Sequence, residues 1–210
     1  MKTPVKRLFF TTTLFFFLAV SFAEAAEEIV TINQADTAWL IVSSALVMLM
    51  LPGLALFYAG MVRRKNVLST LMHSFIPLGV ITFQWVVIGY SLSFGADIGK
   101  LIGGLDKLFL NGITQETLSG TIPELLFCVF QMMFAIITAA LISGSIAERV
   151  SFKGYVIFIF LWSTLVYDPL CHWVWGGGWL FELGALDFAG GTVVHISSGT
   201  AGLAAAIYLK

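Results

Sequence analysis

Residues 187–210 read DFAGGTVVHISSGTAGLAAAIYLK, and this stretch decides the kind of fold that the chain adopts. After Asp187 it contains no Asp, Glu, Lys or Arg until Lys210, as expected of a helix that crosses a membrane. One residue departs from this pattern, because His195 lies about two helical turns inside the apolar segment. A polar side chain at that depth is costly and usually functional. The stretch therefore predicts a transmembrane helix in which the presence of a histidine requires a structural or functional explanation.

The composition of the whole chain points the same way. Of its 210 residues, 59% are hydrophobic and only 11% are charged, and the mean hydropathy is +0.95. A soluble domain has about a quarter of its residues charged, so the composition indicates an integral membrane protein. The basic run at 63–65 lies between apolar segments. We interpret it as a loop anchor at the membrane surface and expect no nucleic-acid partner.

The first 25 residues have the three parts of a secretory signal peptide. Basic residues precede an apolar run over 8–22, and AEA follows at 23–25, as at a cleavage site. The apolar run is shorter than the ~20 residues that a membrane span needs. We therefore predict a cleaved signal peptide over 1–25 and a mature chain over 26–210 that begins outside. The alternative is a retained first helix.

Five apolar segments follow, and each is about long enough to cross a ~30 Å hydrocarbon core at 1.5 Å per residue. They cover residues 39–62, 67–94, 125–147, 154–170 and 191–209. The longest connection between them covers residues 95–123. The pattern predicts an all-α integral membrane fold with five transmembrane helices.

The basic residues indicate how these helices are oriented. If the chain enters from outside, the inner loops and end carry Arg63, Arg64, Lys65, Arg149, Lys153 and Lys210, and the outer loops carry Lys100 and Lys107. This asymmetry predicts an N-out, C-in topology by the positive-inside rule. Since the number of spans is odd, a second such unit in one chain would be inverted, as in many transporters. The sequence contains no internal repeat of its own.

Small residues lie on the helical face of His195. Gly191 and Gly199 are four residues before and after it, and Gly202 is seven after it. Because small residues let another backbone approach closely, we expect this face to pack against protein. His195 then either makes an interhelical hydrogen bond or lines a path for a small solute. Asp187 is expected to cap the helix, with its carboxylate accepting from the first free backbone N–H groups.

Three aromatic residues could form a cation site. Trp175 precedes three glycines at the outer end of the fourth span, and Phe130 and Phe134 share one face of the third. Tryptophan is common at membrane interfaces, and an aromatic pair at this helical spacing is common in packing. The glycines would also allow a tight backbone that turns the indole inward. The face of an indole attracts small cations, so both interpretations stay open.

Two polar residues are expected at the outer end of the fourth span, close to the membrane surface. Because Asp168 precedes Pro169, we expect the helix to end there, with Asp168 near the interface and not deeply buried. His172, beyond this break, is expected near the outer surface. Histidines in three spans could also indicate a haem-binding membrane subunit, which would need two histidines facing each other at similar depth.

The sequence carries no motif for catalysis or for a metal. There is no G-x-S-x-G or H-E-x-x-H pattern and no phosphate-binding glycine loop. Cys128 and Cys171 have no metal-ligand spacing. We therefore expect no enzyme, no cofactor and no metal site.

Taken together, these segments resemble the ammonium transporter (Amt/MEP/Rh) family. The resemblance is carried by DFAGGTVVH at 187–195, HWVWGGG at 172–178, PGLALFYAG at 52–60, RKNVLS at 64–69, FQ at 130–131 with Phe134, and AER at 147–149. It runs from about residue 36 to the end of the chain, and the first of these blocks is highly specific.

The resemblance implies a role for each candidate residue in ammonium transport. Trp175 and Phe130 would form part of an outer site that holds the ammonium cation by cation–π contact. Phe134 would be one of two stacked phenylalanines that close the outer end of the pore. His195 would be the first of two pore histidines on the path of ammonia, and Asp187 would support the outer site structurally.

The resemblance also implies that this chain is the first half of an inverted 5+5 helix repeat, because family members have about twice as many helices. The second histidine, the second phenylalanine and a serine of the outer site would come from the other half. We therefore expect a fragment, or a half that assembles with a separate second half, that is inactive alone. An ammonium sensor is a further alternative.

For the complete protein, the resemblance implies a homotrimer in the lipid bilayer of the bacterial inner membrane. A PII-type regulator would be recognised only through a C-terminal tail that this sequence lacks.

Overall fold

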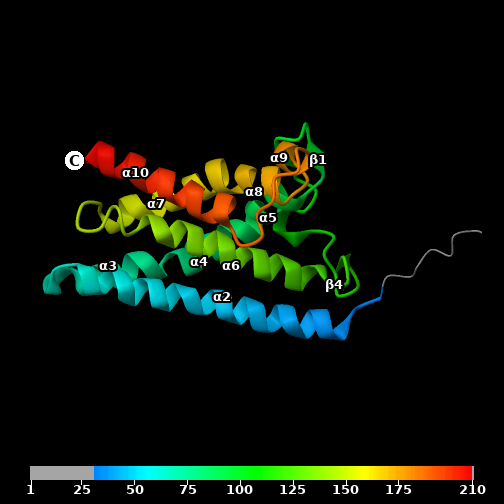
Figure 1. Ribbon diagram of the computed structural model, residues 1–210, viewed down its shortest axis with the longest axis horizontal. Coiled ribbons are helices and arrows are strands. Elements are labelled where there is room, and N and C mark those ends of the chain that lie inside the picture. The colour runs from blue at the N-terminus through cyan, green and yellow to red at the C-terminus, as the bar shows by residue number, and fades with distance from the viewer. Residues whose placement is uncertain (1–30, 210) are drawn as a thin grey trace, which may run out of the picture. The chain divides into compact units, whose positions relative to one another are not determined.

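The computed structural model describes residues 31–209, and in this part of the chain five helices are long and apolar enough to cross a membrane. They cover Gln34–Met61, Arg64–Phe94, Glu124–Ile142, Phe152–Glu182 and Gly191–Leu209. The predicted all-α fold with five spans is confirmed. The predicted signal peptide lies outside the described residues. In Figure 1 the first turn of the first span and the last turn of the fifth lie at opposite ends of the bundle, as an odd number of crossings requires.

The first span is a single helix, α2 (Gln34–Met61). It begins after Asn33, whose side-chain oxygen accepts hydrogen bonds from the backbone N–H groups of Ala35 and Asp36. Many of its large apolar side chains are exposed, including Leu46, Leu49 and Leu56. This is the surface that a lipid-facing helix presents.

The second span is one helical path that a proline and a π turn divide into three α-helical segments. A short 3-10 turn η1 (Arg64–Asn66) leads into α3 (Val67–Phe75), α4 (Pro77–Gln84), a π turn η2 (Trp85–Gly89) and α5 (Tyr90–Phe94). The break at Ile76 has a direct cause, because Pro77 has no N–H to donate and therefore begins a new helix.

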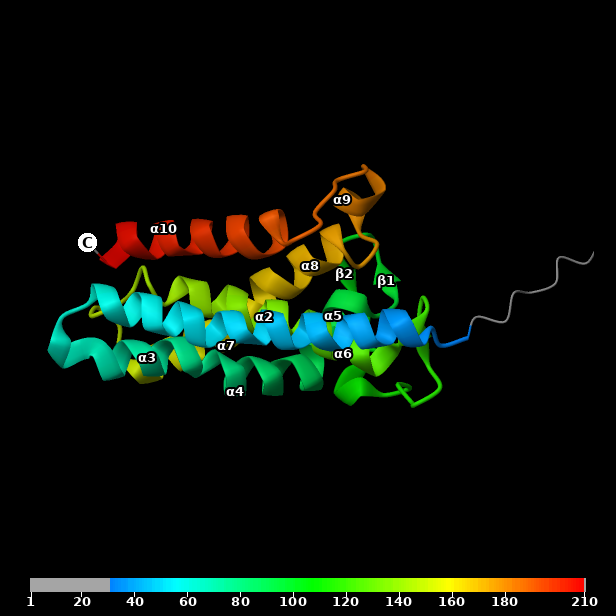
Figure 2. The same ribbon diagram turned by 60° about the horizontal axis from the view of Figure 1, so that its bottom comes forward.

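The third span, α6 (Glu124–Ile142), forms the centre of the bundle. It packs against α2, α4 and α10, and the views in Figures 1 and 2 place it among these helices. Its small side chains Ala135, Ala139 and Ala140 are fully buried, which allows the neighbours to approach closely. The helix ends five residues before the predicted limit at 147. The chain turns after Ile142, and a Cβ at Gly144 would lie 2.6 Å from the ring of Tyr58.

The fourth span corrects the prediction that a helix ends at Asp168. It comprises α7 (Phe152–Trp162), a π turn η4 (Ser163–Tyr167), α8 (Asp168–Val174) and, after a glycine turn, α9 (Trp179–Glu182). Pro169 falls in the first turn of α8, where a missing N–H costs nothing, so the helix continues past it. Asp168 is fully buried and accepts a 2.6 Å hydrogen bond from the side chain of Gln84. The prediction of a shallow Asp168 was therefore wrong.

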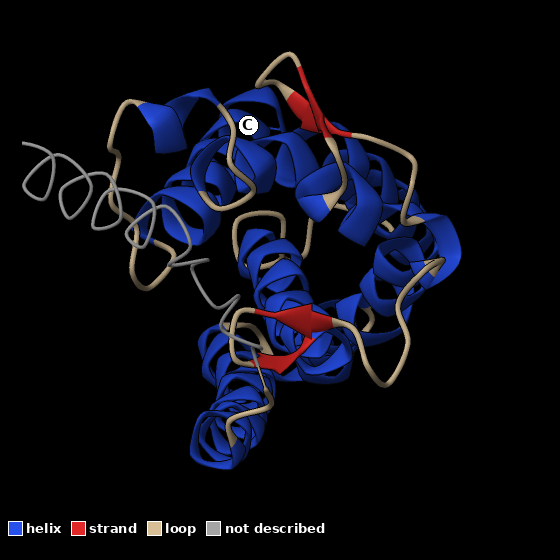
Figure 3. Ribbon diagram, turned by 90° about the vertical axis from the view of Figure 1, so that its right-hand side faces the viewer, coloured by secondary structure: helices blue, strands red, loops and turns tan. Residues whose placement is uncertain are grey.

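The connection between the second and third spans forms a compact lobe, which we call the outer lobe after the side of the membrane predicted for it. It contains a hairpin of β1 (Asp97–Ile98) and β2 (Ile102–Gly103), a 3-10 turn η3 (Leu108–Leu110), and a second hairpin of β3 (Leu118–Ser119) and β4 (Ile122–Pro123). Both pairs are antiparallel, and Figure 3 shows them in red. The lobe lies at the same end of the bundle as α9 (Figure 1). It covers the C-terminal end of α8, which explains why the side chain of His172 is buried.

The fifth span begins with a π turn, η5 (Gly191–Ile196), and continues as α10 (Ser197–Leu209). Figure 2 shows α10 in red along one side of the bundle, next to the end of α8. Gly190 precedes it with a φ of 84°, a left-handed conformation that glycine adopts without strain.

Candidate functional site

The entry to the fifth span is held by one carboxylate. Asp187 Oδ1 accepts hydrogen bonds from the backbone N–H groups of Gly190 at 2.7 Å and Gly191 at 2.8 Å. Its Oδ2 accepts from those of Thr192 at 2.8 Å and Val193 at 3.0 Å. These are the backbone donors that a helix start leaves without partners. The capping contacts predicted for Asp187 are therefore present, and they are more numerous than those of a simple N-cap.

The charge of Asp187 follows from these contacts. Burial raises the pKa of the carboxyl, but the four backbone hydrogen bonds outweigh burial and lower the pKa below its ordinary value. The positive end of the helix dipole favours the same charged form. Asp187 is thus an anion whose oxygens are already occupied by backbone donors.

The same residue also holds the indole of Trp175. Trp175 Nε1 donates a 2.8 Å hydrogen bond to the backbone oxygen of Asp187. The left-handed turn at Gly190 packs closely against Val194 and the Trp175 indole, since a Cβ at Gly190 would lie 2.6 Å from Val194 and 3.8 Å from the Trp175 ring. Asp187 therefore joins the end of the fourth span to the start of the fifth, through its main chain on one side and its side chain on the other.

Three aromatic rings, which we call the aromatic cluster, lie in contact at this junction. The rings of Phe130 and Phe134 are 5.0 Å apart at 88°, and those of Phe134 and Trp175 are 5.8 Å apart at 63°. Edge-to-face contacts of this kind leave part of each ring face available. All three residues are half-buried. The structure thus brings together the three aromatic residues that the sequence singled out.

His195 lies one step further along the fifth span, on a face that the rest of the described chain leaves open. Its side chain is exposed and borders a hollow of about 450 Å³. The hollow is also lined by Tyr58, Leu141, Ser145, Ser198 and Gly199.

The expectation that protein covers the face of His195 is therefore met only in part. Gly202 abuts the turn that follows α6, where a Cβ would meet Ser145 Oγ at 2.7 Å. Gly199 has open space around it within the described residues. His195 itself therefore has no protein neighbour over it in this part of the chain.

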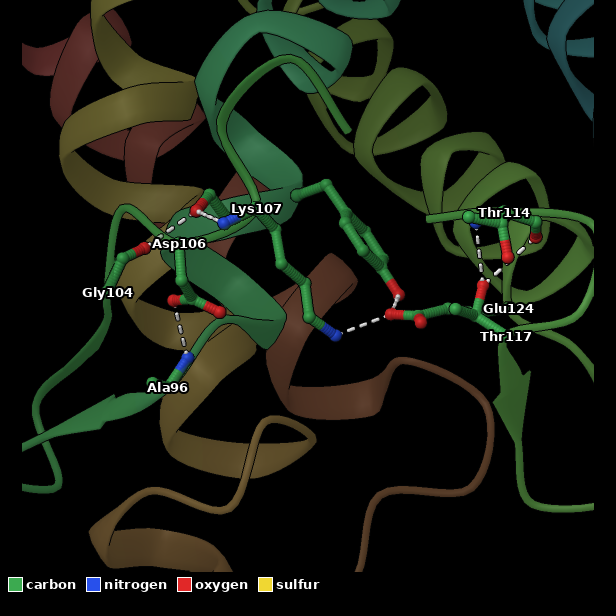
Figure 4. A network of polar contacts seen from close by, with 9 residues as sticks. Ala96, Gly104, Asp106, Lys107, Thr114, Thr117 and Glu124 are labelled. Atoms are coloured by element: carbon green, nitrogen blue, oxygen red, sulfur yellow. Dashed lines mark hydrogen bonds and ion pairs between the residues drawn. The ribbon is translucent and has the colours of Figure 1, made fainter. Parts of the chain in front are cut away.

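A partly buried ion pair near Trp175 was missed by the sequence analysis. Glu124, the first residue of α6, accepts hydrogen bonds from Tyr90 Oη at 2.9 Å and from Lys107 Nζ. Figure 4 shows Lys107 reaching across to Glu124, beside the Asp106 carboxylate that accepts from the backbone of Ala96. The pair borders a hollow of about 280 Å³ that Trp175 also lines. An acidic residue directly after Pro123 was the available signal.

His172 was also left without a role, and the structure gives it two partners. Its Nδ1 lies 3.0 Å from the backbone oxygen of Ser93, and its Nε2 lies 2.9 Å from Asp97 Oδ1. The hydrogen bond from His172 holds the pKa of Asp97 below its ordinary value, and Lys100 contributes in the same direction.

The contacts of His172 do not fit a haem. Both ring nitrogens of His172 are engaged by protein oxygens, so neither is available to an iron atom. Among residues 31–209 no group of three or more His, Cys, Asp and Glu side chains could hold a metal ion.

Comparisons with known proteins agree on one family. Residues 38–210 match the Ammonium Transporter Family. An ammonium transporter of Bacillus subtilis is 54% identical over 179 residues, which cover 84% of this chain and 44% of that protein. Ammonium transporter Amt1 of Archaeoglobus fulgidus is 51% identical over 175 residues, which cover 83% of this chain and 43% of that protein. This chain spans less than half the length of these curated relatives.

Solved structures give the same result. The crystal structure of Candida albicans Mep2 matches with a TM-score of 0.79 and 41% identity, over 85% of this chain and 40% of that one. A structure described as a Sensor Amt Protein matches with a TM-score of 0.76 and 32% identity, over 82% and 43% of the two chains. The similarity extends over all five spans and identifies a multi-pass membrane protein rather than an enzyme.

Proposed function

We propose that this chain, which belongs to the ammonium transporter family, takes part in moving ammonium across a membrane as neutral ammonia. One observation carries the proposal. Asp187 accepts the indole N–H of Trp175 and also caps the helix that carries His195. Asp187 thereby fixes the position of the proposed cation site at Trp175 relative to the candidate pore residue His195.

Capture of the cation is assigned to the aromatic cluster. The faces of Trp175 and Phe130 would hold an ammonium ion by cation–π attraction, which contributes about 0.5–2 kcal/mol depending on how dry the site is. The Asp187 anion adds a negative field close by. Because its oxygens already accept four backbone hydrogen bonds, it supports the site and does not ligate the ion directly.

We assign passage beyond Phe134 to neutral ammonia. A charged group at the centre of a bilayer costs from about 2.5 to 17 kcal/mol, depending on the measurement. Loss of a proton before entry avoids this cost, and desolvation of an amine-type cation promotes that loss. His195 would then line the path, since a neutral imidazole offers both a donor and an acceptor.

Several features of the complete protein belong to the same proposal. The exposed hollow beside His195 supports a second set of helices facing α10, with the remaining pore residues on them. The N-out orientation, the signal peptide over 1–25, the bacterial inner membrane, a homotrimer and a PII-type regulator rest on the resemblance and on the charge pattern. A second candidate function is ammonium sensing, which the similarity to the Sensor Amt Protein favours.

A chimera tests the proposal. Residues 34–209 replace the matching segment of the Bacillus subtilis relative, and methylammonium uptake is measured in a transporter-deficient host. We expect uptake, and we expect Trp175→Leu to raise KM about 2- to 30-fold, the equivalent of the cation–π energy. Trp179→Leu, at an exposed tryptophan outside the aromatic cluster, is the control and should leave KM unchanged.

Two results would contradict the proposal. One is an absence of uptake by a chimera that reaches the membrane in normal amounts. The other is an equal effect of the two tryptophan substitutions on KM.

A further inference from the structure

His172 is buried three residues before Trp175, and both of its ring nitrogens face oxygen atoms. Its side chain is 0% exposed, and its partners come from two other elements, Ser93 of α5 and Asp97 of β1. Both contacts have hydrogen-bonding distances, 3.0 Å from Nδ1 and 2.9 Å from Nε2. The ring is therefore fixed at a point where the outer lobe meets α8.

Neither partner oxygen can donate a proton to the ring. A backbone carbonyl only accepts, so the contact with Ser93 requires a proton on Nδ1. Asp97 Oδ1 also accepts the backbone N–H of Lys100 at 3.1 Å, and the Lys100 ammonium lies 3.5 Å from Oδ2. Asp97 is thus an ionised acceptor, and Nε2 must carry a proton as well. A neutral imidazole has a single N–H and cannot satisfy both contacts.

We infer that His172 is a doubly protonated positioning residue, whose two N–H groups tie α5 and β1 to the turn that presents Trp175. The protonation follows from the contacts among His172, Ser93, Asp97 and Lys100 and does not depend on the proposed function. The importance of placing Trp175 rests on the proposed function.

The backbone after Trp175 packs directly on the His172 contact. The N–H groups of Gly176 and Gly178 donate to the backbone oxygen of His172 at 3.0 and 2.9 Å. A Cβ at Gly176 would lie 2.1 Å from the Ser93 oxygen and 2.7 Å from His172 Nδ1. The turn therefore has no room to accept a different His172 ring position, and a shift of the ring would displace Trp175.

Charges around His172 balance its positive charge. The charged or acidic groups near it are Asp97 on β1, Lys100 on the hairpin turn, Glu182 on α9 and Asp168 one turn earlier on α8. Lys100 links Asp97 to Glu182, whose carboxylate lies 2.9 Å from its Nζ. The segments α5, β2, η4 and η5, which also pack against α8, contain no Asp, Glu, Lys or Arg. The paired imidazolium therefore adds no net positive charge beside a site that captures a cation.

Two substitutions of Asp97 distinguish the effect of its negative charge from the effect of its hydrogen bond to His172. Asp97→Asn can turn its amide N–H toward Nε2, so a neutral His172 would keep both contacts. Asp97→Ala removes the partner altogether. Glu182→Gln is the matched control, because it changes the outer end of the same charge chain and leaves both His172 contacts in place.

Nitrogen-15 NMR of the purified chain in lipid nanodiscs reads the protonation directly. The chain has only three histidines, so His172→Gln suffices to assign the His172 signals. At neutral pH we expect one-bond N–H couplings on both ring nitrogens in the wild type and in Glu182→Gln, and on one nitrogen in Asp97→Asn. A single N–H in the wild type, or two in Asp97→Asn, would overturn the inference.

The NMR signal of the Trp175 indole N–H reports on the position of that ring without any transport assay. We expect Asp97→Ala to shift it strongly and Glu182→Gln to leave it unchanged. In the chimera, Asp97→Ala should raise KM for methylammonium about 3- to 10-fold with little change in the maximal rate. An unshifted Trp175 signal would overturn the positioning role. If the NMR results are as expected but neither Asp97→Ala nor Trp175→Leu changes KM, the inference about His172 stands and the proposed function fails.

Discussion

Replacement of Asp187 by asparagine is the most informative single perturbation of this structure. The two residues have nearly the same shape, but asparagine has one acceptor oxygen where aspartate has two. Each carboxylate oxygen of Asp187 serves two backbone N–H groups. In Asp187→Asn one of these pairs therefore faces an amide nitrogen that donates and cannot accept.

The cost follows from the contacts. A hydrogen bond to a charged group contributes about 1.5–3 kcal/mol, and two are lost. We use the lower end because asparagine is itself a good cap and water reaches the exposed Gly191. Loss of the favourable interaction with the helix dipole adds about 0.3–1 kcal/mol. We therefore expect Asp187→Asn to lower the free energy of unfolding by about 3–4 kcal/mol.

The control is the equivalent change at the start of the first span. Asp36 lies in the first turn of α2, is exposed, and accepts one side-chain hydrogen bond, from Thr121 at 2.6 Å. Asp36→Asn should cost about 0.5 kcal/mol. Reversible unfolding of both variants in mixed micelles, followed by circular dichroism, measures the difference. If the two costs agree within about 1 kcal/mol, the four-bond cap does not have the strength that we assign to it.

Three further predictions concern the same outer region. First, the pKa of Asp187 is lower in the folded chain than its ordinary value of about 3.9. The stabilisation by its charge is therefore complete above that value and is lost as the pH falls through the folded pKa. In acid unfolding, the stabilities of wild type and Asp187→Asn should converge below about pH 4. Second, Gly190→Ala should lower the free energy of unfolding by at least about 2 kcal/mol, because Gly190 has a left-handed φ and its Cβ would lie 2.6 Å from Val194. The control Gly191→Ala should cost under about 1 kcal/mol. Thermal or denaturant unfolding measures both. Third, Lys107→Met should cost about 2 kcal/mol, because the buried Glu124 carboxylate keeps the Tyr90 hydroxyl as a donor but loses its cation. The double variant with Glu124→Gln should recover most of that loss, and additive costs would contradict the assignment.

The features that the sequence predicted correctly are local ones. Five apolar segments of sufficient length can form only membrane helices, because every backbone polar group must find a partner inside its own segment. The cap at Asp187 is equally local, since its acceptors and donors lie within six residues. The approach of Phe130 to Phe134 follows from their spacing on one helix.

The features that the sequence missed depend on distant partners. Asp168 was expected at the interface because a proline follows it, but Gln84, 84 residues away, provides its hydrogen bond inside the bundle. His172 was expected near the outer surface and had no predicted partner, and its two contacts come from Ser93 of α5 and Asp97 of the outer lobe. No helical periodicity encodes which lobe residue reaches which helix, so these contacts appear only in the folded chain.

The π turn at the start of the fifth span shows how local and distant features combine at the candidate site. The Asp187 carboxylate gathers four successive N–H groups, and the helix then begins with the wider turn η5, which carries His195. π turns inside helices occur frequently at functional sites. The distant contact is the indole of Trp175, which binds the main chain of the same aspartate. A shift in the helix start would therefore move the aromatic cluster and His195 together, so the capture and passage steps that we propose would be coupled mechanically.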